Sequence, residues 1–211
     1  MNREELVKVI GEEKLVFVTR LKDASKAQTV IQSLVSGGAK VMEITSNTPN
    51  YAHEISKARK SYPDVLIGAG TVVNKAIAAE AINAGAQFLV TPNCNVELID
   101  LAHKNEIPIL MGALTPTEIC EAWEAGADFV KLFPADIMGI TYFTSIKAPL
   151  DHIKLMAVGG IKLNEVKDWM TSGADGIGIA SVVSEPISIK ADYQMIEDNA
   201  SQFVTEIAKY K

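Results

Sequence analysis

GADFVKLFP, at residues 126–134, joins a helix stop to a short apolar strand. Glycine enters the left-handed conformation that ends a helix without strain, so Gly126-Ala127 indicates where one helix stops and a strand begins. Lys131 interrupts the apolar run that follows. The same joint recurs three more times, as Gly38-Ala39, Gly85-Ala86 and Gly173-Ala174. Four copies of one joint indicate a repeated unit of helix and strand.

Short runs rich in apolar residues recur along the chain, with helical patterns between them. They lie at residues 15–20, 40–45, 65–70, 87–92, 107–112, 128–134, 154–159 and 175–180. Successive runs begin about 20 to 26 residues apart, which is the length of one strand and one crossover helix. Such units place their strands in parallel, and eight of them favour a closed (β/α)8 barrel of the TIM type.

An open, doubly wound sheet is the alternative architecture. It usually has fewer strands and a glycine-rich first turn, whereas the first turn here, TRLKDASKA at residues 19–27, has no glycine. Gly68-Ala69-Gly70 lacks the third glycine of a dinucleotide-binding fingerprint. We therefore expect one barrel domain over residues 1–211, with an extra N-terminal helix before Glu12 and a closing helix over residues 192–211.

Composition excludes several classes of protein. The net charge of −6 argues against a general attraction to nucleic acid or to an anionic membrane. No apolar run reaches the length of about 18 residues that a membrane span needs, and the acidic first segment is unlike a signal peptide. Two cysteines do not make a disulfide framework. We expect a cytoplasmic protein with neither nucleic-acid nor membrane partners.

Lys131 is the first candidate for chemistry, because active sites in such barrels lie at the C-terminal ends of the strands. Burial in an apolar strand disfavours the charged amine, and a neutral amine can attack a ketone to form an imine. The alternatives are a lysine whose amine reaches out to the strand end, or one that is paired structurally with an acid.

Glu43 interrupts another predicted strand, residues 40–45, in the same way. Strand alternation places Val41, Glu43 and Thr45 on one face. A glutamate near Lys131 could transfer protons, either directly or through water. A structural ion pair with Lys131 is the alternative.

Glycines mark the ends of three predicted strands. Gly159-Gly160 ends the seventh, and Gly178 lies in the eighth, shortly before Ser181. In barrels these two loops commonly bind phosphate through backbone N–H groups, so a phosphorylated ligand is predicted; glycines needed only for turns are the alternative. At the third strand, GAGT at residues 68–71 is either a tight turn or a place where a ligand approaches the backbone.

Other reactive side chains lack partners in the sequence. His53, His103 and His152 lie far apart on helical or loop segments, without the spacing of metal ligands. Cys94 follows Pro92-Asn93 near a strand end, but no histidine partner is evident. The sequence therefore predicts neither a metal nor another cofactor.

Six short motifs in order resemble the KHG/KDPG aldolase family, class I aldolases that act on 2-keto-3-deoxy-6-phosphogluconate and related acids. The motifs are MEIT at 42–45, GAGTV at 68–72, TPN at 91–93, VKLFPA at 130–135, AVGGI at 157–161 and Ser181. The resemblance covers nearly the whole barrel, from about Leu15 to Ser181. It implies a homotrimer of (β/α)8 subunits that needs no metal.

The resemblance also assigns roles to individual residues. Lys131 matches the Schiff-base lysine and Glu43 the general acid and base. The residues that match the substrate-binding part of the site are Arg20, Thr71 and Pro92. The residues that match the phosphate-binding positions are Gly159, Gly160 and Ser181.

Two positions depart from gluconate-specific members of the family. Those members carry an arginine where this chain has Asn47, and a threonine where it has Val158. The combination of Asn47, TPN and AVGG is more similar to the branch that cleaves the galactonate epimer. Asn47 is expected beside the substrate, and Arg20 and Thr71 are left to hold its carboxylate.

The expected reaction is cleavage of a 2-keto-3-deoxy-6-phospho sugar acid to pyruvate and glyceraldehyde 3-phosphate. Within the same chemistry, 4-hydroxy-2-oxoglutarate is an alternative substrate. Outside it, the alternatives are a sugar-phosphate isomerase or synthase on the same barrel, and a non-catalytic sugar-phosphate-binding protein. An isomerase or synthase would explain the glycines after the seventh and eighth strands but not a buried Lys131, whereas a binding protein would tolerate a charged, unreactive lysine.

Overall fold

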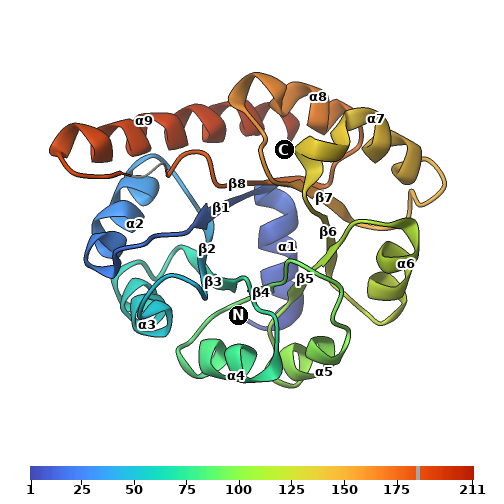
Figure 1. Ribbon diagram of the computed structural model, residues 1–211, viewed down its shortest axis with the longest axis horizontal. Coiled ribbons are helices and arrows are strands. Elements are labelled where there is room, and N and C mark those ends of the chain that lie inside the picture. The colour runs from blue at the N-terminus through green and yellow to red at the C-terminus, as the bar shows by residue number, and fades with distance from the viewer. Residues whose placement is uncertain (184–185) are drawn as a thin grey trace.

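The computed structural model describes residues 1–183 and 186–211. Its strands close into a parallel barrel in the order β1 to β8 (Figure 1). They are β1 (Leu15–Thr19), β2 (Val41–Thr45), β3 (Leu66–Gly70), β4 (Leu89–Val90), β5 (Ile109–Ala113), β6 (Phe129–Leu132), β7 (Leu155–Val158) and β8 (Gly176–Ile179). Each overlaps one predicted run, so the (β/α)8 prediction is confirmed and the open sheet is wrong.

Helices follow the strands and surround the barrel (Figure 1). They are α2 (Ala27–Ser36), α3 (Tyr51–Ser61), α4 (Lys75–Asn83), α5 (Glu97–Lys104), α6 (Pro116–Glu124), α7 (Ala135–Lys147), α8 (Val166–Thr171) and α9 (Lys190–Ile207), with short 3-10 turns η1 (Ala24–Lys26), η2 (Leu163–Glu165) and η3 (Ala208–Tyr210). Within the described part of the chain, none of the helices has both the length and the apolar character of a transmembrane span.

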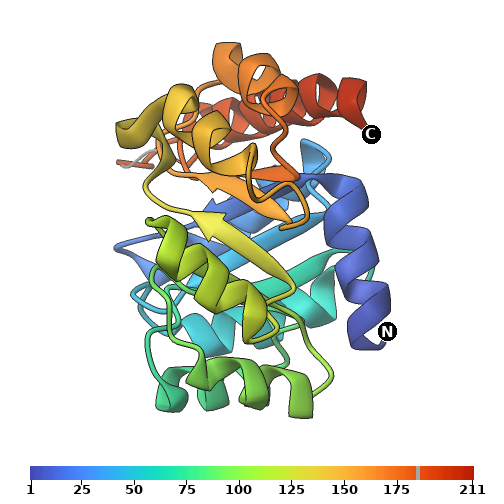
Figure 2. The same ribbon diagram turned by 90° about the vertical axis from the view of Figure 1, so that its right-hand side faces the viewer.

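The helix α1 (Arg3–Glu13) precedes the repeat, as predicted. It begins with a capping box in which Asn2 and Glu5 each bond the other's backbone N–H, at 2.9 Å in both cases. Its buried residues are Leu6 and Ile10. Figure 2 shows α1 on the side opposite the arrowheads, so it covers the end of the barrel where the strands begin.

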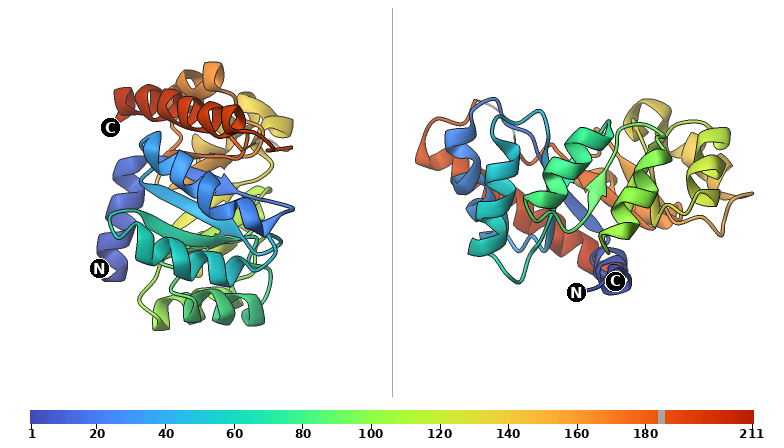
Figure 3. Two further views of the ribbon diagram at one scale, coloured as in Figure 1. Left: turned by 90° about the vertical axis from the view of Figure 1, so that its left-hand side faces the viewer. Right: turned by 90° about the horizontal axis from the view of Figure 1, so that it is seen from below.

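The closing helix α9 lies across α2 (Figure 3). Gly37, at the C-cap of α2, makes this close contact possible, because a Cβ there would lie 2.5 Å from the Glu197 carbonyl oxygen. The expected closing helix is therefore confirmed, although it begins two residues earlier than predicted, at Lys190.

The strand β4 is shorter than the predicted run at 87–92 because the chain turns directly after it. Thr91 donates its hydroxyl to the Asn93 carbonyl at 2.7 Å and accepts the Gly112 N–H at 2.8 Å. Pro92 has no N–H to offer a strand ladder. These two features end β4 at Val90.

The four Gly-Ala joints end helices as predicted. The glycines are Gly38, Gly85, Gly126 and Gly173, with φ of 93°, 91°, 101° and 93°. At the first joint the Gly38 N–H bonds the Val35 carbonyl at 2.9 Å, and the Ala39 N–H bonds the Leu34 carbonyl at 3.0 Å. The same pair of bonds closes the other three helices, which is the Schellman arrangement.

The residue after three of these joints has a role that sequence analysis did not foresee. Its side chain accepts an N–H near the start of the preceding strand. The pairs are Gln87 with Ile67 at 3.1 Å, Asp128 with Ile109 at 2.9 Å, and Asp175 with Leu155 at 2.8 Å. These bonds join neighbouring strands at the base of the barrel, where side chains serve stability.

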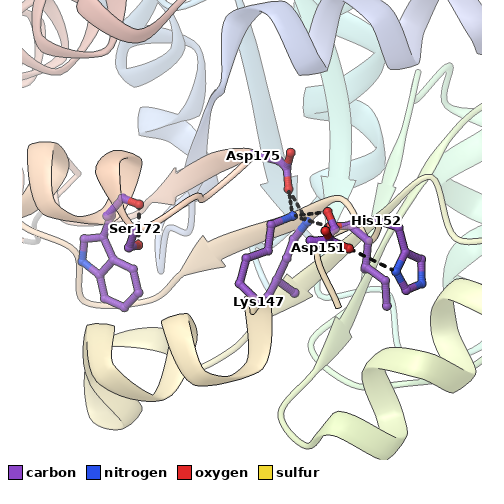
Figure 4. A network of polar contacts seen from close by, with 8 residues as sticks. Lys147, Asp151, His152, Ser172 and Asp175 are labelled. Carbon is purple, nitrogen blue, oxygen red and sulfur yellow. Dashed lines mark hydrogen bonds and ion pairs between the residues drawn. The ribbon is translucent and has the colours of Figure 1, made fainter. Parts of the chain in front are cut away.

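Replacing Asp175 with alanine is expected to destabilise the protein by about 2 kcal/mol. The carboxylate accepts the Leu155 N–H and the Lys147 ammonium group, both at 2.8 Å (Figure 4). Lys147 also bonds the Asp151 and Ile153 carbonyls, so the network holds the start of β7. Urea denaturation monitored by circular dichroism measures the change.

Asp151→Ala is the matched control, because among the described residues the exposed Asp151 carboxylate is paired only with His152, at 3.8 Å (Figure 4). The Asp151 carbonyl that Lys147 contacts is retained in that variant. Equal unfolding free energies for the two variants would contradict the structural role of Asp175.

Candidate active site

Lys131 on β6 and Glu43 on β2 face one another across the barrel interior. The two strands lie on opposite sides of the barrel, yet each residue shifts the pKa of the other through its charge. Lys131 is 6% exposed and Glu43 is 2% exposed. Within the described residues, neither a hydrogen bond nor an ion pair joins them directly, so a direct structural salt bridge does not explain their burial.

Burial governs the protonation of both groups. It lowers the pKa of the Lys131 amine, which the positive Arg20 lowers further and the negative Glu43 raises in part. Burial raises the pKa of the Glu43 carboxyl, and the charges of Lys131 and Arg20 oppose that change. The site therefore favours the neutral amine, which is the nucleophilic form.

Two opposite shifts in the pKa of Lys131 are expected when its neighbours are neutralised. Glu43→Gln removes the charge that stabilises the ammonium form, so the amine should become reactive at lower pH than in the wild type. Arg20→Ala removes a repelling cation, so reactivity should begin at higher pH. The rate of Lys131 acetylation by acetic anhydride, followed against pH by peptide mass spectrometry, measures both shifts.

In the wild type, acetylation of Lys131 should reach half its maximum rate below pH 10.5, the ordinary lysine value. Lys154, on the loop that enters β7, is the internal reference in the same digest. Shifts of the same sign in the two variants would contradict the electrostatic account.

The surroundings of Glu43 and Lys131 explain two motif residues. Gly70 ends β3 beside the Glu43 carboxylate, and a Cβ there would lie 2.3 Å from Oε1. Gly68 makes room for the Phe88 ring, since its Cβ would lie 2.5 Å from a ring carbon. The glycines at 68 and 70 thus make room for protein side chains. Phe133 lies 4.9 Å from the Lys131 Nζ, measured to the ring centroid.

Thr71 follows β3 with a φ of 58°, a conformation that is unusual for a β-branched residue. Ser46, which follows β2, donates its hydroxyl to the Thr71 carbonyl at 2.8 Å. Pro92 follows β4 and rests on Gly112, where a Cβ would lie 2.4 Å from the Pro92 carbonyl carbon. Sequence analysis missed Ser46, and no motif marked it.

The predicted phosphate loops lie after β7 and β8. Gly159 and Gly160 have φ of 107° and 69°, so both need the freedom of glycine. The Ser181 hydroxyl donates to the Ile161 carbonyl at 3.4 Å, which links the two loops. Asp136 lies beside Gly160, where a Cβ would lie 1.9 Å from a carboxylate oxygen.

The remaining predicted residues are exposed at the same end of the barrel. Arg20 follows β1, and Asn47 lies in the loop after β2. All nine predicted site residues therefore lie within a barrel strand or in the first residues after its C-terminal end. Among the described residues, no group of three or more histidine, cysteine, aspartate or glutamate side chains is placed to hold a metal.

Comparison with known proteins identifies the family of the chain. The family model for KDPG and KHG aldolase matches residues 6–199. A 2-dehydro-3-deoxy-phosphogluconate aldolase of Treponema pallidum is 35% identical over 158 residues, covering 74% of this chain and 75% of its own. A 2-dehydro-3-deoxy-6-phosphogalactonate aldolase of Escherichia coli is 30% identical over 199 residues, covering 93% and 94%.

A solved structure has a similar fold. It is the KDPG aldolase of Legionella pneumophila with pyruvate captured as a covalent carbinolamine intermediate, at a TM-score of 0.84 and 26% identity. The match covers 92% of this chain and 96% of that one. The chain belongs to the KDPG and KHG aldolase family and is a class I aldolase, a carbon–carbon lyase.

Proposed function

We propose that this aldolase cleaves a 2-keto-3-deoxy-6-phospho sugar acid to pyruvate and glyceraldehyde 3-phosphate, with Lys131 as the nucleophile. One observation carries the proposal: a buried lysine with a lowered pKa faces a buried glutamate inside the barrel. Relatives named for phosphogluconate and for phosphogalactonate match the chain to similar degrees. The alternatives of an isomerase, a synthase or a non-catalytic binder have no support in the family assignment.

The reaction begins when the neutral Lys131 amine attacks the C2 ketone. Loss of water gives an imine. Glu43 transfers the protons of this step through water, because in the described part of the chain neither a hydrogen bond nor an ion pair joins it to Lys131. Glu43 then accepts the C4 hydroxyl proton as the C3–C4 bond breaks. The bonding electrons pass to the protonated imine and form an enamine, while C4 leaves as an aldehyde. Protonation at C3 and hydrolysis release pyruvate and restore the amine.

The substrate spans the mouth of the barrel in this proposal. The phosphate binds at Gly159, Gly160 and Ser181, where both glycines have a positive φ and backbone N–H groups are the donors that anions commonly use. The carboxylate lies one bond from C2 and therefore close to Lys131, with Arg20 and Thr71 as its donors. Asn47 and Pro92 complete the wall. We also propose that the protein is a homotrimer, as the resemblance implies, and that it is cytoplasmic.

Three substrates test this assignment in parallel: the phosphogluconate-type acid, its phosphogalactonate-type C4 epimer, and 4-hydroxy-2-oxoglutarate. Pyruvate release is followed with lactate dehydrogenase. We expect cleavage of the phosphorylated acids, with the galactonate epimer preferred because of Asn47 and Val158. A higher kcat/KM for 4-hydroxy-2-oxoglutarate than for both phosphorylated acids would contradict the proposed phosphate site.

Incubation with pyruvate and borohydride tests the nucleophile separately. Borohydride transfers hydride to the imine and leaves a stable secondary amine. A pyruvyl adduct on the peptide that contains Lys131 is the expected result, whereas an adduct on another lysine would overturn the assignment.

A further inference from the structure

Thr71 is an extra residue between β3 and β4. The Ala69 N–H bonds the Phe88 carbonyl at 3.0 Å, and the next bond runs from the Val72 N–H to the Val90 carbonyl at 3.1 Å. The donors are three residues apart, whereas the acceptors are two apart. One residue, Thr71, is therefore left out of the ladder, as in a β-bulge.

The bulge leaves polar groups of Thr71 available. Among the residues that the structure describes, the Thr71 N–H and hydroxyl make no hydrogen bond. Thr71 is half-buried and follows Gly70, whose Cα lies against the Glu43 carboxylate. These two donors thus lie at the reacting end of the site, remote in the barrel from the glycine loops after β7 and β8.

Ser46 holds this bulge from the end of the neighbouring strand, because it lies directly after β2, which pairs with β3. Its N–H donates to the Gly70 carbonyl and its hydroxyl donates to the Thr71 carbonyl, both at 2.8 Å. A β-branched residue at a φ of 58° persists only where its surroundings hold it there. The backbone bond of Ser46 ends the β2–β3 ladder, so the hydroxyl is the contact that acts on Thr71 itself.

We infer that Ser46 is a positioning residue whose hydroxyl keeps Thr71 in its left-handed conformation, so that the free Thr71 donors bind the keto-acid carboxylate. This inference rests on the proposed function, because the carboxylate must lie one bond from the carbon that Lys131 attacks. Ser46 does not touch the reacting atoms and acts only through Thr71.

Ser46→Ala tests the inference through the pyruvate concentration that gives half-maximal borohydride trapping on Lys131. We expect that concentration to rise about tenfold, the size of a charge-assisted hydrogen bond that is no longer aligned. With methyl pyruvate, which lacks the carboxylate charge, the change should be about twofold or less. Ser46→Thr, which keeps the hydroxyl, should restore the wild-type value for pyruvate.

Ser145→Ala is the matched control, because Ser145 also donates its hydroxyl to a backbone carbonyl, that of Thr141 at 2.7 Å, in the last turns of α7. Melting temperatures show that all variants are folded under the trapping conditions. Equal changes with pyruvate and methyl pyruvate, or no change with either, would overturn the role of Ser46 and leave the proposed function standing. Absence of trapping on Lys131 in the wild type would overturn both.

Discussion

Lys131→Ala is expected to lose cleavage activity by a factor of about 10⁵ or more, because the imine forms on Lys131 in the proposed mechanism. The fold should be retained, since the change removes a buried charge-bearing group and leaves the strand backbone intact. Steady-state turnover of the phosphorylated keto acid and circular dichroism measure the two effects.

Lys154→Ala is the control for Lys131→Ala. Lys154 lies directly before β7, with its Nζ 5.4 Å from the centroid of the Phe129 ring, at the opposite end of the barrel from the site. The Lys154→Ala variant should cleave the substrate as fast as the wild type. Substantial cleavage by the Lys131→Ala variant would contradict the covalent mechanism.

Glu43→Gln is expected to reduce kcat by about 10²- to 10⁴-fold, the usual contribution of general acid–base catalysis. Glutamine keeps the shape of the side chain beside Gly70 but cannot accept the C4 hydroxyl proton. KM should change much less than kcat, because the residue transfers protons and does not anchor the substrate in the proposed mechanism. Steady-state kinetics separates the two parameters.

Glu54→Gln provides a comparison in which another buried glutamate loses its charge. Glu54 is 7% exposed on α3 and bonds Gln28 at 2.5 Å, outside the barrel. The Glu54→Gln variant should keep the wild-type kcat. Normal turnover in Glu43→Gln would remove Glu43 from the proton transfer and leave water alone in that role.

Arg20 and Glu43 have opposite effects on the pKa of Lys131, so the activity of the variants should also depend on pH. Raising the pH through the lowered pKa of Lys131 produces the free amine, and Glu43→Gln should move that onset to lower pH. Glu43→Gln can therefore have a larger fraction of neutral Lys131 amine than the wild type at the same pH and still have a lower kcat. Such a separation would show that the neutral amine and the proton transfer are distinct requirements.

The sequence was sufficient for the architecture because each unit carries its own signals. The joint at Gly126-Ala127 stops a helix through a local backbone preference, and the apolar run after it is long enough for one strand. Repetition at the length of a crossover helix leaves little choice but parallel strands. β4 was overestimated the most, because the bonds that end it come from Thr91 and from Gly112, about twenty residues further along the chain.

The sequence by itself also singled out the two ionisable residues, Lys131 and Glu43, that the structure buries inside the barrel. A lysine or glutamate inside an apolar strand is costly, and that cost is visible without coordinates. What the sequence could not decide was how the two are related, since direct pairing and separate roles would look alike. The closed barrel places them across its interior without a direct bond.

Only the tertiary structure decided the supporting positions. Gly70 is glycine because the Glu43 carboxylate, from another strand, occupies the space of its Cβ. Thr71 is left-handed although threonine disfavours that conformation, because Ser46 and the β4 ladder hold it. Local preferences report on one segment at a time, whereas these contacts exist only after strands that are distant in sequence have closed into one barrel.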